Sequence, residues 1–507
     1  MVAFLSVRRT AVRGAALAVA LATVMSLSTV AAATAAPAGG SGTESTYIVL
    51  VHQGASSSRA ASAVGSAGGT VVANYQEIGV VVARSSNPGF AAAMRGAAGI
   101  DGAAATEGFA VSGDGTSFDE TVAGPLPGNA PATDSDNLSG RQWDMRQINA
   151  PQAHAISGGS PQVVVGDLDT GLDFTHPDIA PNYAPELSAD CSSGTAQPLL
   201  PGNDRNGHGT HTAGTIAAAA NGTGIVGVAP NVRIAGIKTA NDSGLFFPEM
   251  VVCAYMWVAS HGIDVTNNSY FADPWFFNCR NDPEQRVIWN AERRAIRFAQ
   301  SRGTVVVASE NNQSTDLSHP EIDDISPDFP PGAAEERSVT NACAIVPVEV
   351  PGVVGVTATG DLSLKSFYSN YGTSTADVAA PGGDSQLQRT PDAPNGAVLS
   401  TWPASRPCGS QVLDPTTGAR YCFLQGTSMA SPHVAGVAAL IRSQHGTMSS
   451  GAVAAKLQQA TNALACPDVS IYARFPQIGG APQACQGGTG HNSFYGAGEI
   501  DALKAVS

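Results

Sequence analysis

From about residue 141 onward, short apolar runs alternate with longer segments of helical pattern. The runs have the length of single strands and cover 163–168, 233–237, 304–308 and 353–356. The helical segments cover 210–220, 248–260, 285–300 and 431–444. Strands that are apolar throughout and separated by helices are typical of a parallel sheet covered on both faces. The pattern therefore predicts an α/β fold with a mostly parallel central sheet and helices on both faces.

The charge of the chain excludes several classes of partner. Its 507 residues carry a formal net charge of -15. Such a chain repels nucleic acid and anionic membrane surfaces, so we expect neither as a partner. With 43% hydrophobic and 13% charged residues, the chain can bury a large core and is not globally disordered.

The first 36 residues have the pattern of a secretory signal peptide. Arg8, Arg9 and Arg13 form a charged start, an alanine-rich apolar run follows at 15–30, and small residues at 33–35 offer a cleavage site. A membrane anchor is the alternative, but the apolar run is short and interrupted by serine and threonine. We therefore expect a secreted protein.

Eight cysteines in an exported chain favour disulfides over metal ligation. Two pairs are near enough in sequence to close local loops, namely Cys408 with Cys422, and Cys466 with Cys485. The sequence does not tell how the other four are paired, which are Cys191, Cys253, Cys279 and Cys343.

A small segment of mixed pattern and a linker precede the α/β region. Strand patterns at 46–51 and 79–83 flank a helical pattern at 57–67. The stretch from about 113 to 140 is rich in glycine, proline and serine, which is typical of a linker. The predicted division is a signal peptide at 1–36, a small α+β domain at 37–112, a linker or processing region at 113–140, and a main domain at 141–507.

The stretch 424–436, LQGTSMASPHVAG, places Ser428 at or just before the start of a small-residue helix. Free backbone N–H groups and the helix dipole favour negative charge at such a start. A serine nucleophile needs that environment because its attack on a carbonyl creates an oxyanion. Pro432 fits a first helical turn, where its missing N–H costs little. The alternative role for Ser428 is a plain helix N-cap.

A serine nucleophile also needs a base and an orienting acid. In 206–214, NGHGTHTAG, glycines flank His208 and a helical run follows. A zinc pair with His211 is the alternative, but this HxxH motif lacks a third ligand. Asp169 ends the first apolar strand, at the edge where α/β sheets bind ligands, and Asp167 is its main competitor. A strand-end aspartate can also be a simple turn former.

Taken together, the three motifs resemble those of the subtilase family of serine proteases. They read Asp169-Thr-Gly, His208-Gly-Thr-His and Gly-Thr-Ser428-Met-Ala, and the resemblance extends from about residue 141 to the end of the chain. It implies a three-layer subtilisin-like α/β fold. It also implies Asp169 as orienting acid, His208 as general base and acid, and Ser428 as nucleophile.

The resemblance further implies a secreted endopeptidase made as a zymogen. The segment at 37–112 then corresponds to an inhibitory propeptide that folds separately, acts as an intramolecular inhibitor and is removed. Protein or peptide substrates are the other implied partners, and a monomer is implied. One rival is an inactive subtilase-fold binding protein, which the loss of a triad member would favour. The other is a related peptidase with glutamate in place of the histidine, against which His208 argues.

An oxyanion donor and a substrate strand are also implied. Asn311 falls at the family's asparagine position after the run 304–308, although Glu310 replaces the usual glycine; Asn312 is the alternative donor. The segment that starts at Asn267 resembles the strand that pairs with extended substrate. It supplies three expected substrate-binding residues, which are Ser269, Tyr270 and Phe271.

A structural calcium ion is the cofactor that the resemblance implies. Calcium prefers oxygen ligands. The family's ligand positions correspond here to the side chains of Asp178 and Asn221 and to the carbonyls of Ala219, Thr223 and Ile225. The alternative is a plain turn.

An acidic insertion lies between Asn311 and the run 353–356. Its carboxylates are Glu321, Asp323, Asp324, Asp328, Glu335 and Glu336. In the family, the chain after the oxyanion asparagine helps to form the pocket for the residue before the scissile bond. Carboxylates beside that pocket would favour arginine or lysine in the substrate. The alternative is a solvated surface loop.

Overall fold

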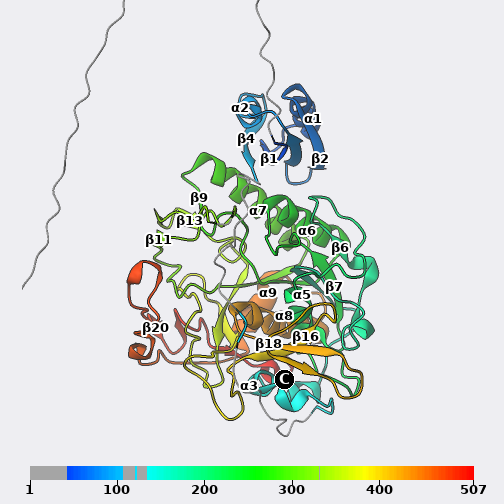
Figure 1. Cartoon of the computed structure of the whole chain (residues 1–507), viewed down its shortest axis with the longest axis vertical. Helices are drawn as coiled ribbons and strands as arrows, with labels where there is room; N and C mark the ends of the chain where they lie inside the picture. Colours follow the sequence, from blue (N-terminus) through cyan, green and yellow to red (C-terminus); the bar gives the residue numbers. More distant parts are fainter. Residues whose placement is uncertain (1–42, 107–119, 123–133, 331) are drawn as a thin grey trace, which may run out of the picture. The chain divides into compact units, whose positions relative to one another are not determined.

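The predicted strands form the centre of a nine-stranded sheet (Figure 1). The computed structural model describes residues 43–106, 120–122, 134–330 and 332–507. The strand order is β19 (Thr461–Asn462), β22 (Glu499–Ile500), β15 (Val378–Pro381), β14 (Val354–Thr359), β10 (Val305–Ser309), β8 (Val265–Asn268), β5 (Val164–Asp169), β7 (Arg233–Lys238) and β6 (Ala189–Asp190). Only β19 and β22 pair antiparallel within this sheet, so the predicted mostly parallel sheet is confirmed.

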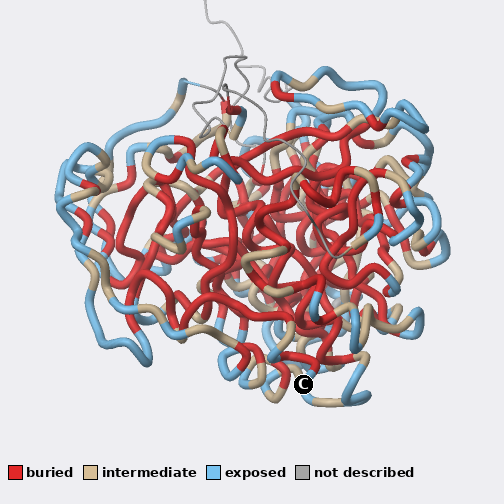
Figure 2. Tube along the Cα trace, turned by 90° about the horizontal axis from the view of Figure 1, so that it is seen from below, coloured by how far each residue is buried: buried red, intermediate tan, exposed pale blue. Residues whose placement is uncertain are grey.

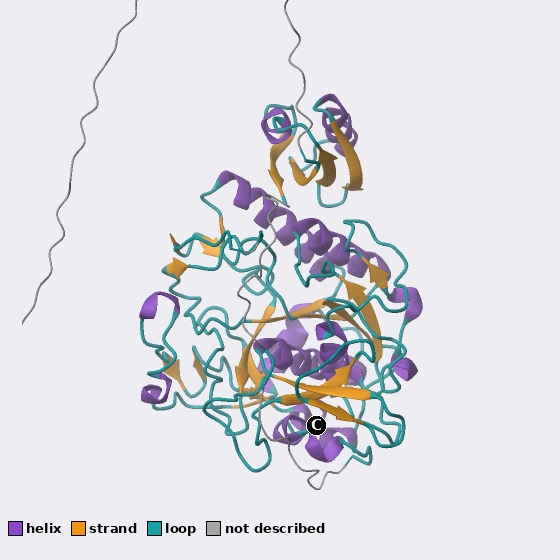
Figure 3. Cartoon of the chain, in the orientation of Figure 1, coloured by secondary structure: helices purple, strands orange, loops and turns teal. Residues whose placement is uncertain are grey.

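Helices cover both faces of the large sheet (Figure 3). On one face lie α5 (His208–Ala217) and α8 (Thr427–His445), and on the other lie α6 (Pro248–His261) and α7 (Pro283–Ser301). A single strand contributes side chains to the apolar cores on both faces of the sheet. Val306 of β10 belongs to the core with α6 and α7, whereas Val305 belongs to the core with α8. The apolar residues of these strands therefore occupy consecutive positions, such as Val305 to Val307 in β10, instead of alternating with polar ones.

Smaller elements surround this body. The remaining helices are α3 (Trp143–Gln147), α4 (Ala150–His154), α9 (Ser450–Gln459) and α10 (Ala502–Val506). A three-stranded antiparallel sheet has the order β16 (Val398–Trp402), β18 (Arg420–Leu424) and β17 (Gln411–Leu413). Three two-stranded antiparallel sheets pair β9 (Asn278–Cys279) with β13 (Cys343–Ala344), β11 (Ile322–Asp323) with β12 (Arg337–Ser338), and β20 (Gly487–Gly488) with β21 (His491–Asn492). Figure 2 shows the buried trace in red in the interior and exposed segments at the rim.

A separate small α+β domain precedes the large sheet. Its antiparallel strands follow the order β2 (Gly69–Tyr75), β3 (Val80–Ser85), β1 (Ser45–Val51) and β4 (Ile100–Ala105), and its helices are α1 (Ser57–Ser66) and α2 (Phe90–Arg95). Val49, Val64 and Phe90 belong to its own apolar core. This domain is consistent with the predicted propeptide.

The outer face of the α+β sheet contacts α7, within one compact unit that spans Gly42–Ser507. Arg294 of α7 donates to Val51 O at 2.9 Å and pairs with Asp101 at 3.1 Å. Leu50 and Val82 join the same apolar core as α6 and α7. The predicted signal peptide and linker residues 113–119 and 123–133 lie outside the described residues. In the described part of the chain, no helix is both long and apolar enough to cross a membrane.

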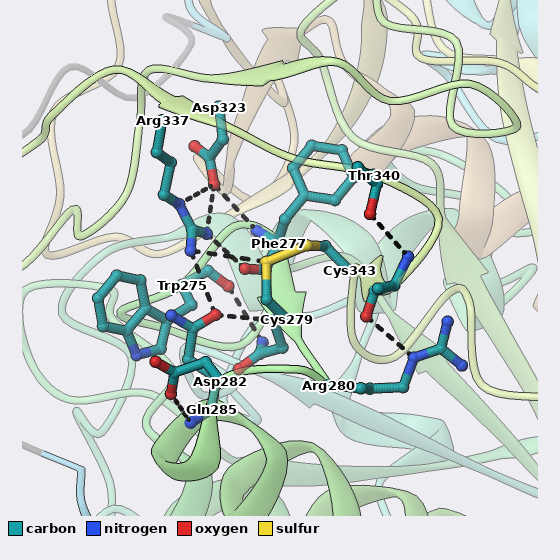
Figure 4. Close-up of a disulfide and its surroundings, with 12 residues drawn as sticks. Trp275, Phe277, Cys279, Arg280, Asp282, Gln285, Asp323, Arg337, Thr340 and Cys343 are labelled. Carbon is teal, nitrogen blue, oxygen red and sulfur yellow. Dashed lines mark hydrogen bonds and ion pairs between the residues drawn. A yellow bond between two sulfur atoms is a disulfide. The ribbon is translucent and has the colours of Figure 1, made fainter.

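Four disulfides link the chain, and the two local pairs predicted from the sequence are confirmed. The other two join Cys191 to Cys253 and Cys279 to Cys343. The Cys279–Cys343 bond joins β9 to β13, beside a cluster of polar contacts at the start of α7 (Figure 4). In that cluster the Arg337 guanidinium lies over the Trp275 ring, 4.9 Å from its centroid.

Candidate active site

His208 and Asp169 meet where β5 ends and α5 begins. His208 Nδ1 lies 2.7 Å from Asp169 Oδ1, which also accepts the N–H of Thr170. The helix can begin this close to the strand because residue 209 is glycine: a Cβ on Gly209 would lie 2.2 Å from Gly171 O. The pair thus has the contact through which a carboxylate orients a histidine base.

Asp167, the competing carboxylate, is buried and engaged elsewhere. Its Oδ1 accepts a hydrogen bond from Asn267 Nδ2 at 2.9 Å, and its Oδ2 accepts one from Thr212 Oγ1 at 2.8 Å. Burial and then the nearby Asp169 carboxylate raise the pKa of Asp167 well above its ordinary value. The geometry therefore favours Asp169 as the partner of His208.

His208 has a second carboxylate neighbour that the sequence analysis did not single out. Glu120, from the predicted linker, places Oε2 at 3.3 Å from His208 Nε2. Burial lowers the pKa of His208, but the Asp169 and Glu120 carboxylates outweigh it and hold that pKa well above its ordinary value. Nε2 is the nitrogen through which a triad histidine exchanges protons with the serine and the leaving group.

Ser428 lies in the first turn of α8 and is buried. The helix begins at Thr427, four residues before the predicted start, so Pro432 lies inside it and the prediction of a first-turn proline is wrong. An interior proline lacks the N–H that would donate to the carbonyl four residues earlier, here that of Ser428. Ser269 Oγ donates to Ser428 O instead, at 2.9 Å, and Ser428 Oγ donates to Ser269 O at 3.4 Å.

The turn after β10 brings Asn312, not Asn311, to the nucleophile's helix start. Asn312 Oδ1 accepts from the Thr427 N–H at 2.9 Å and from Thr427 Oγ1 at 3.0 Å. Asn311 directs its amide back to its own strand, where Nδ2 donates to Ser309 O at 3.4 Å. The geometry thus favours the alternative donor considered in the sequence analysis.

Glu310 lies between β10 and the turn that contains Asn311 and Asn312. Its side chain is fully buried, and its N–H donates to Val356 O at 3.0 Å, which continues the pairing of β10 with β14. The positive φ of the turn, 71°, then falls on Asn311. Asparagine tolerates this conformation better than most residues. Burial and then Glu349 raise the pKa of Glu310 well above its ordinary value.

The predicted substrate strand is tied to the nucleophile by a residue that was not predicted to have this role. Asn267 Nδ2 donates to both Asp167 Oδ1 and Ser269 Oγ, while Asn267 Oδ1 accepts from Ser431 Oγ at 2.7 Å. It therefore joins β5, β8 and α8. In the sequence, the only sign of this link is the run of polar residues Asn267, Asn268 and Ser269 at the end of β8.

Two of the predicted substrate-binding residues use their rings for packing. The Tyr270 ring stacks on Phe246 with centroids 4.2 Å apart, and Tyr270 is 5% exposed. The Phe271 ring meets Phe276 edge-on at 5.1 Å and is partly exposed. Ser269, Tyr270 and Phe271 follow β8, which ends at Asn268, and the Tyr270 side chain offers little free surface.

His211 points away from His208. Its Nε2 lies 3.1 Å from Cys422 O, and its ring packs edge-on against Trp402. Burial and then His208 lower the pKa of His211 to about 3. The ring is thus a buried neutral contact between α5 and β18, which does not favour the zinc-pair alternative.

The predicted calcium-binding residues lie together. Asp178 Oδ2 accepts from Ile225 N–H at 3.0 Å and from Tyr421 at 2.8 Å, and Asn221 Nδ2 lies 3.3 Å from Asp178 Oδ1. Asp136, which was not predicted, accepts the Asn221 N–H at 3.0 Å. Asn221 also caps its own loop, since its Oδ1 accepts from the N–H and hydroxyl of Thr223, and Asp178 O accepts the N–H of Ala219.

A match to a protein-family model decides to which family the chain belongs, because the match covers more than half of the chain. The subtilase family model matches residues 160–498. The chain belongs to the subtilase family of serine proteases.

Known subtilases resemble the chain over about three fifths of its length. Over 318 residues it is 30% identical to the thermophilic serine proteinase of Bacillus sp. (strain AK1), which covers 62% of this chain and 61% of that protein. Over 316 residues it is 31% identical to subtilisin DY of Bacillus licheniformis, which covers 62% of this chain and 89% of that protein. The chain thus spans less than two thirds of the first relative.

A solved structure supports the subtilase fold over nearly the whole chain. The epidermin leader peptide processing serine protease from Staphylococcus aureus superposes with a TM-score of 0.65 at 22% identity. The match covers 91% of this chain and 98% of that one. The three-layer α/β architecture predicted from the sequence is therefore confirmed.

Part of the acidic insertion of this subtilase is structural. Asp323 is fully buried and pairs with Arg337 at 2.6 Å (Figure 4). Burial raises the pKa of Asp328 above its ordinary value, although a hydrogen bond with Asp273 lowers it. A cavity of about 240 Å³ follows the oxyanion turn, and its lining includes Asp316 and Glu321 but none of the three predicted triad residues. The prediction that Asp323 acts as a free negative charge toward substrate is therefore wrong.

Many subtilases bind calcium, and the carboxylates at the Asp178 loop are the residues here that bear on such an ion. Burial and then the Asp136 charge raise the pKa of Asp178 to about 7. Asp136 Oδ1 is buried without a hydrogen-bond partner. In the described ranges there is no group of three or more Asp, Glu, His or Cys side chains arranged for a metal, so backbone carbonyls would have to complete the ligand set.

Proposed function

We propose that this subtilase is a secreted serine endopeptidase made as a zymogen. The observation that carries the proposal is the 2.7 Å contact between Asp169 and His208 of α5, a helix that packs against α8, whose first turn holds Ser428. All three members of an Asp-His-Ser triad are present. An inactive binding protein of the same fold has no need to keep this set.

In the proposed reaction, Ser428 Oγ attacks the peptide carbonyl and His208 Nε2 accepts its proton. Asp169 holds the opposite ring nitrogen and stabilises the imidazolium that forms. His208 then gives the proton to the leaving amine. A water molecule, activated by the same histidine, hydrolyses the acyl-enzyme and restores Ser428.

We assign the side-chain oxyanion donor to Asn312. The assignment is supported by the two hydrogen bonds that Asn312 Oδ1 accepts from Thr427, the residue directly before Ser428, which leave the Nδ2 group as the available donor of that amide. Such preorganised donors supply on the order of 3 kcal/mol to the transition state. The sequence-based assignment to Asn311 is replaced because that amide is directed to Ser309 O.

The proposed division of the chain follows the predicted one. Residues 1–36 direct export, 37–112 inhibit the enzyme until they are removed, 113–140 contain the processing region and 141–507 carry the activity. Asp136 and Leu138, from the end of the processing region, already contact the proposed calcium loop. Calcium would be held by Asp178, Asp136, Asn221 and the loop carbonyls, and would neutralise two buried carboxylates there.

Replacing the nucleophile tests this function. The full-length Ser428→Ala chain should show no hydrolysis of casein and should retain its propeptide, because self-processing needs the same hydroxyl. Ser443→Ala, on the same helix but remote from the helix start, is the matched control and should process and hydrolyse normally. Normal processing and casein hydrolysis by purified Ser428→Ala protein would refute the assignment.

A further inference from the structure

Three residues of the predicted linker, Glu120, Thr121 and Val122, lie against the active site, and we call them the strap. The strap pairs with the segment that leads into the nucleophile: Gln425 N–H donates to Glu120 O at 3.0 Å, and Thr121 forms an antiparallel bridge with Leu424. The strap therefore pairs with the end of β18 and with the residue that follows it, three positions before Ser428.

The far end of the strap is anchored by apolar packing. Val122 is 6% exposed and belongs to a buried cluster with Leu399 and Phe423. Ser410 Oγ donates to Val122 O. Backbone pairing, apolar burial and a side-chain hydrogen bond together give the strap a defined position.

This position brings the Glu120 carboxylate to the catalytic histidine. Its Oε2 lies 3.3 Å from His208 Nε2, and the two side chains are only 19% and 14% exposed. Residue 426 leaves room for the carboxylate because it is glycine: a Cβ on Gly426 would lie 2.7 Å from Glu120 Oε1. A charge pair this well shielded from water is worth more than a surface pair.

We propose that the strap is a latch that keeps the active site latent, with the Glu120 carboxylate in the place of the leaving group at His208 Nε2. The inference rests on the proposed function. A triad histidine must accept the serine proton at Nε2 and pass it to the leaving amine. Bound to Glu120, Nε2 does neither, and the Ser428 hydroxyl is directed to Ser269 O instead.

The latch is distinct from inhibition by the α+β domain. That domain contacts α7, whereas the strap contacts β18 and His208. The α+β domain ends with β4 at Ala105, before the strap. A cut between them leaves the strap on the enzyme, so we infer that activation needs a second step in which the strap is displaced or trimmed.

Labelling of Ser428 with a fluorophosphonate tests the latch directly. The full-length chain is expressed as wild type, Glu120→Gln, Val122→Asp and the matched control Glu77→Gln, an exposed glutamate of the α+β domain. Intact-mass spectrometry over time gives the labelling rate of each species and shows whether that species retains residues 120–122. Val122→Asp removes the apolar anchor while it leaves the Glu120 carboxylate in place.

The latch predicts at least tenfold faster labelling of Val122→Asp and Glu120→Gln than of wild-type species that retain the strap, with Glu77→Gln unchanged. Wild-type species that have lost residues 120–122 should label as fast as the two variants. Equal rates for species with and without a working strap would overturn the latch but leave the protease assignment intact. Labelling that is absent throughout, or that persists in Ser428→Ala, would overturn the proposed function and the latch with it.

Discussion

At the scale of single residues, the turn that follows the buried Glu310 sets which asparagine lies at the start of α8. Because Glu310 is buried and extends β10, the positive φ falls on Asn311 and the amide of Asn312 meets Thr427. Motif position alone could not predict this shift, since the conformation of the turn depends on where Glu310 is buried. Asp169 and His208 were predictable because each lies directly at the end of an element visible in the sequence.

Replacing each asparagine separately distinguishes the two assignments. Asn312→Ala should lower kcat by about 10²- to 10³-fold with little change in KM, since the lost donor acts on the transition state. Asn311→Ala should change kcat far less and act mainly on stability, because its amide caps Ser309 O. Steady-state kinetics on a chromogenic peptide measure both effects, and a larger loss of kcat in Asn311→Ala would restore the sequence-based assignment.

At the scale of elements, the start of α8 depends on a hydrogen bond from outside the helix. Pro432 leaves the Ser428 carbonyl without its helical donor, and Ser269 Oγ supplies one. The sequence predicted the helix but placed its start too late, because a proline is usually read as a first-turn residue. The strands β5, β7, β10 and β14 were predictable, since burial on both faces gives each of them consecutive apolar residues, whereas the mostly polar β8 between them gave no such signal.

A double-mutant cycle tests the link between Ser269 and Pro432. Ser269→Ala should lower the free energy of unfolding by about 1–3 kcal/mol, because the Ser428 carbonyl loses its donor in a buried site. In a Pro432→Ala background the new helical N–H can bond that carbonyl, so the same replacement should cost less. Denaturant unfolding of Ser428→Ala chains, which avoid autolysis, gives the coupling. Additive effects of the two replacements would contradict it.

At the scale of the whole molecule, contacts between residues far apart in the chain create features that the sequence pattern does not predict. Asp136 and Glu120 lie in a segment whose composition predicts only a linker, yet Asp136 contacts Asn221 of the proposed calcium loop and Glu120 contacts His208. The pairings Cys191–Cys253 and Cys279–Cys343 also depend on the folded topology. Each closes a loop of more than 60 residues, which the chain-entropy model values at about 4 kcal/mol.

Removing calcium should make stability depend on pH through Asp178. Its folded pKa is raised to about 7 from an ordinary 3.8, so the folded state retains a proton that the unfolded chain releases. Stability from this group is therefore complete below about pH 3.8 and falls as pH rises toward 7. In calcium-free buffer the Tm of the Ser428→Ala chain should fall between pH 5 and pH 8.

Calcium should offset this loss by neutralising the carboxylates. At a hundredfold excess over Kd the gain is about 2.7 kcal/mol, visible as a higher Tm at pH 8. Asp178→Asn, which cannot ionise at that position, is the control and should show a weaker dependence on both pH and calcium. A Tm at pH 8 that calcium leaves unchanged would count against an ion at this loop.

The site of a covalent adduct tests the central claim most directly. The secreted chain, treated with a fluorophosphonate and digested, should yield one labelled peptide with the adduct on Ser428. Labelling should be lost in His208→Ala, because Ser428 needs that base, and retained in His211→Ala if the protein folds. An adduct on another serine, or undiminished labelling without His208, would contradict a triad of Asp169, His208 and Ser428.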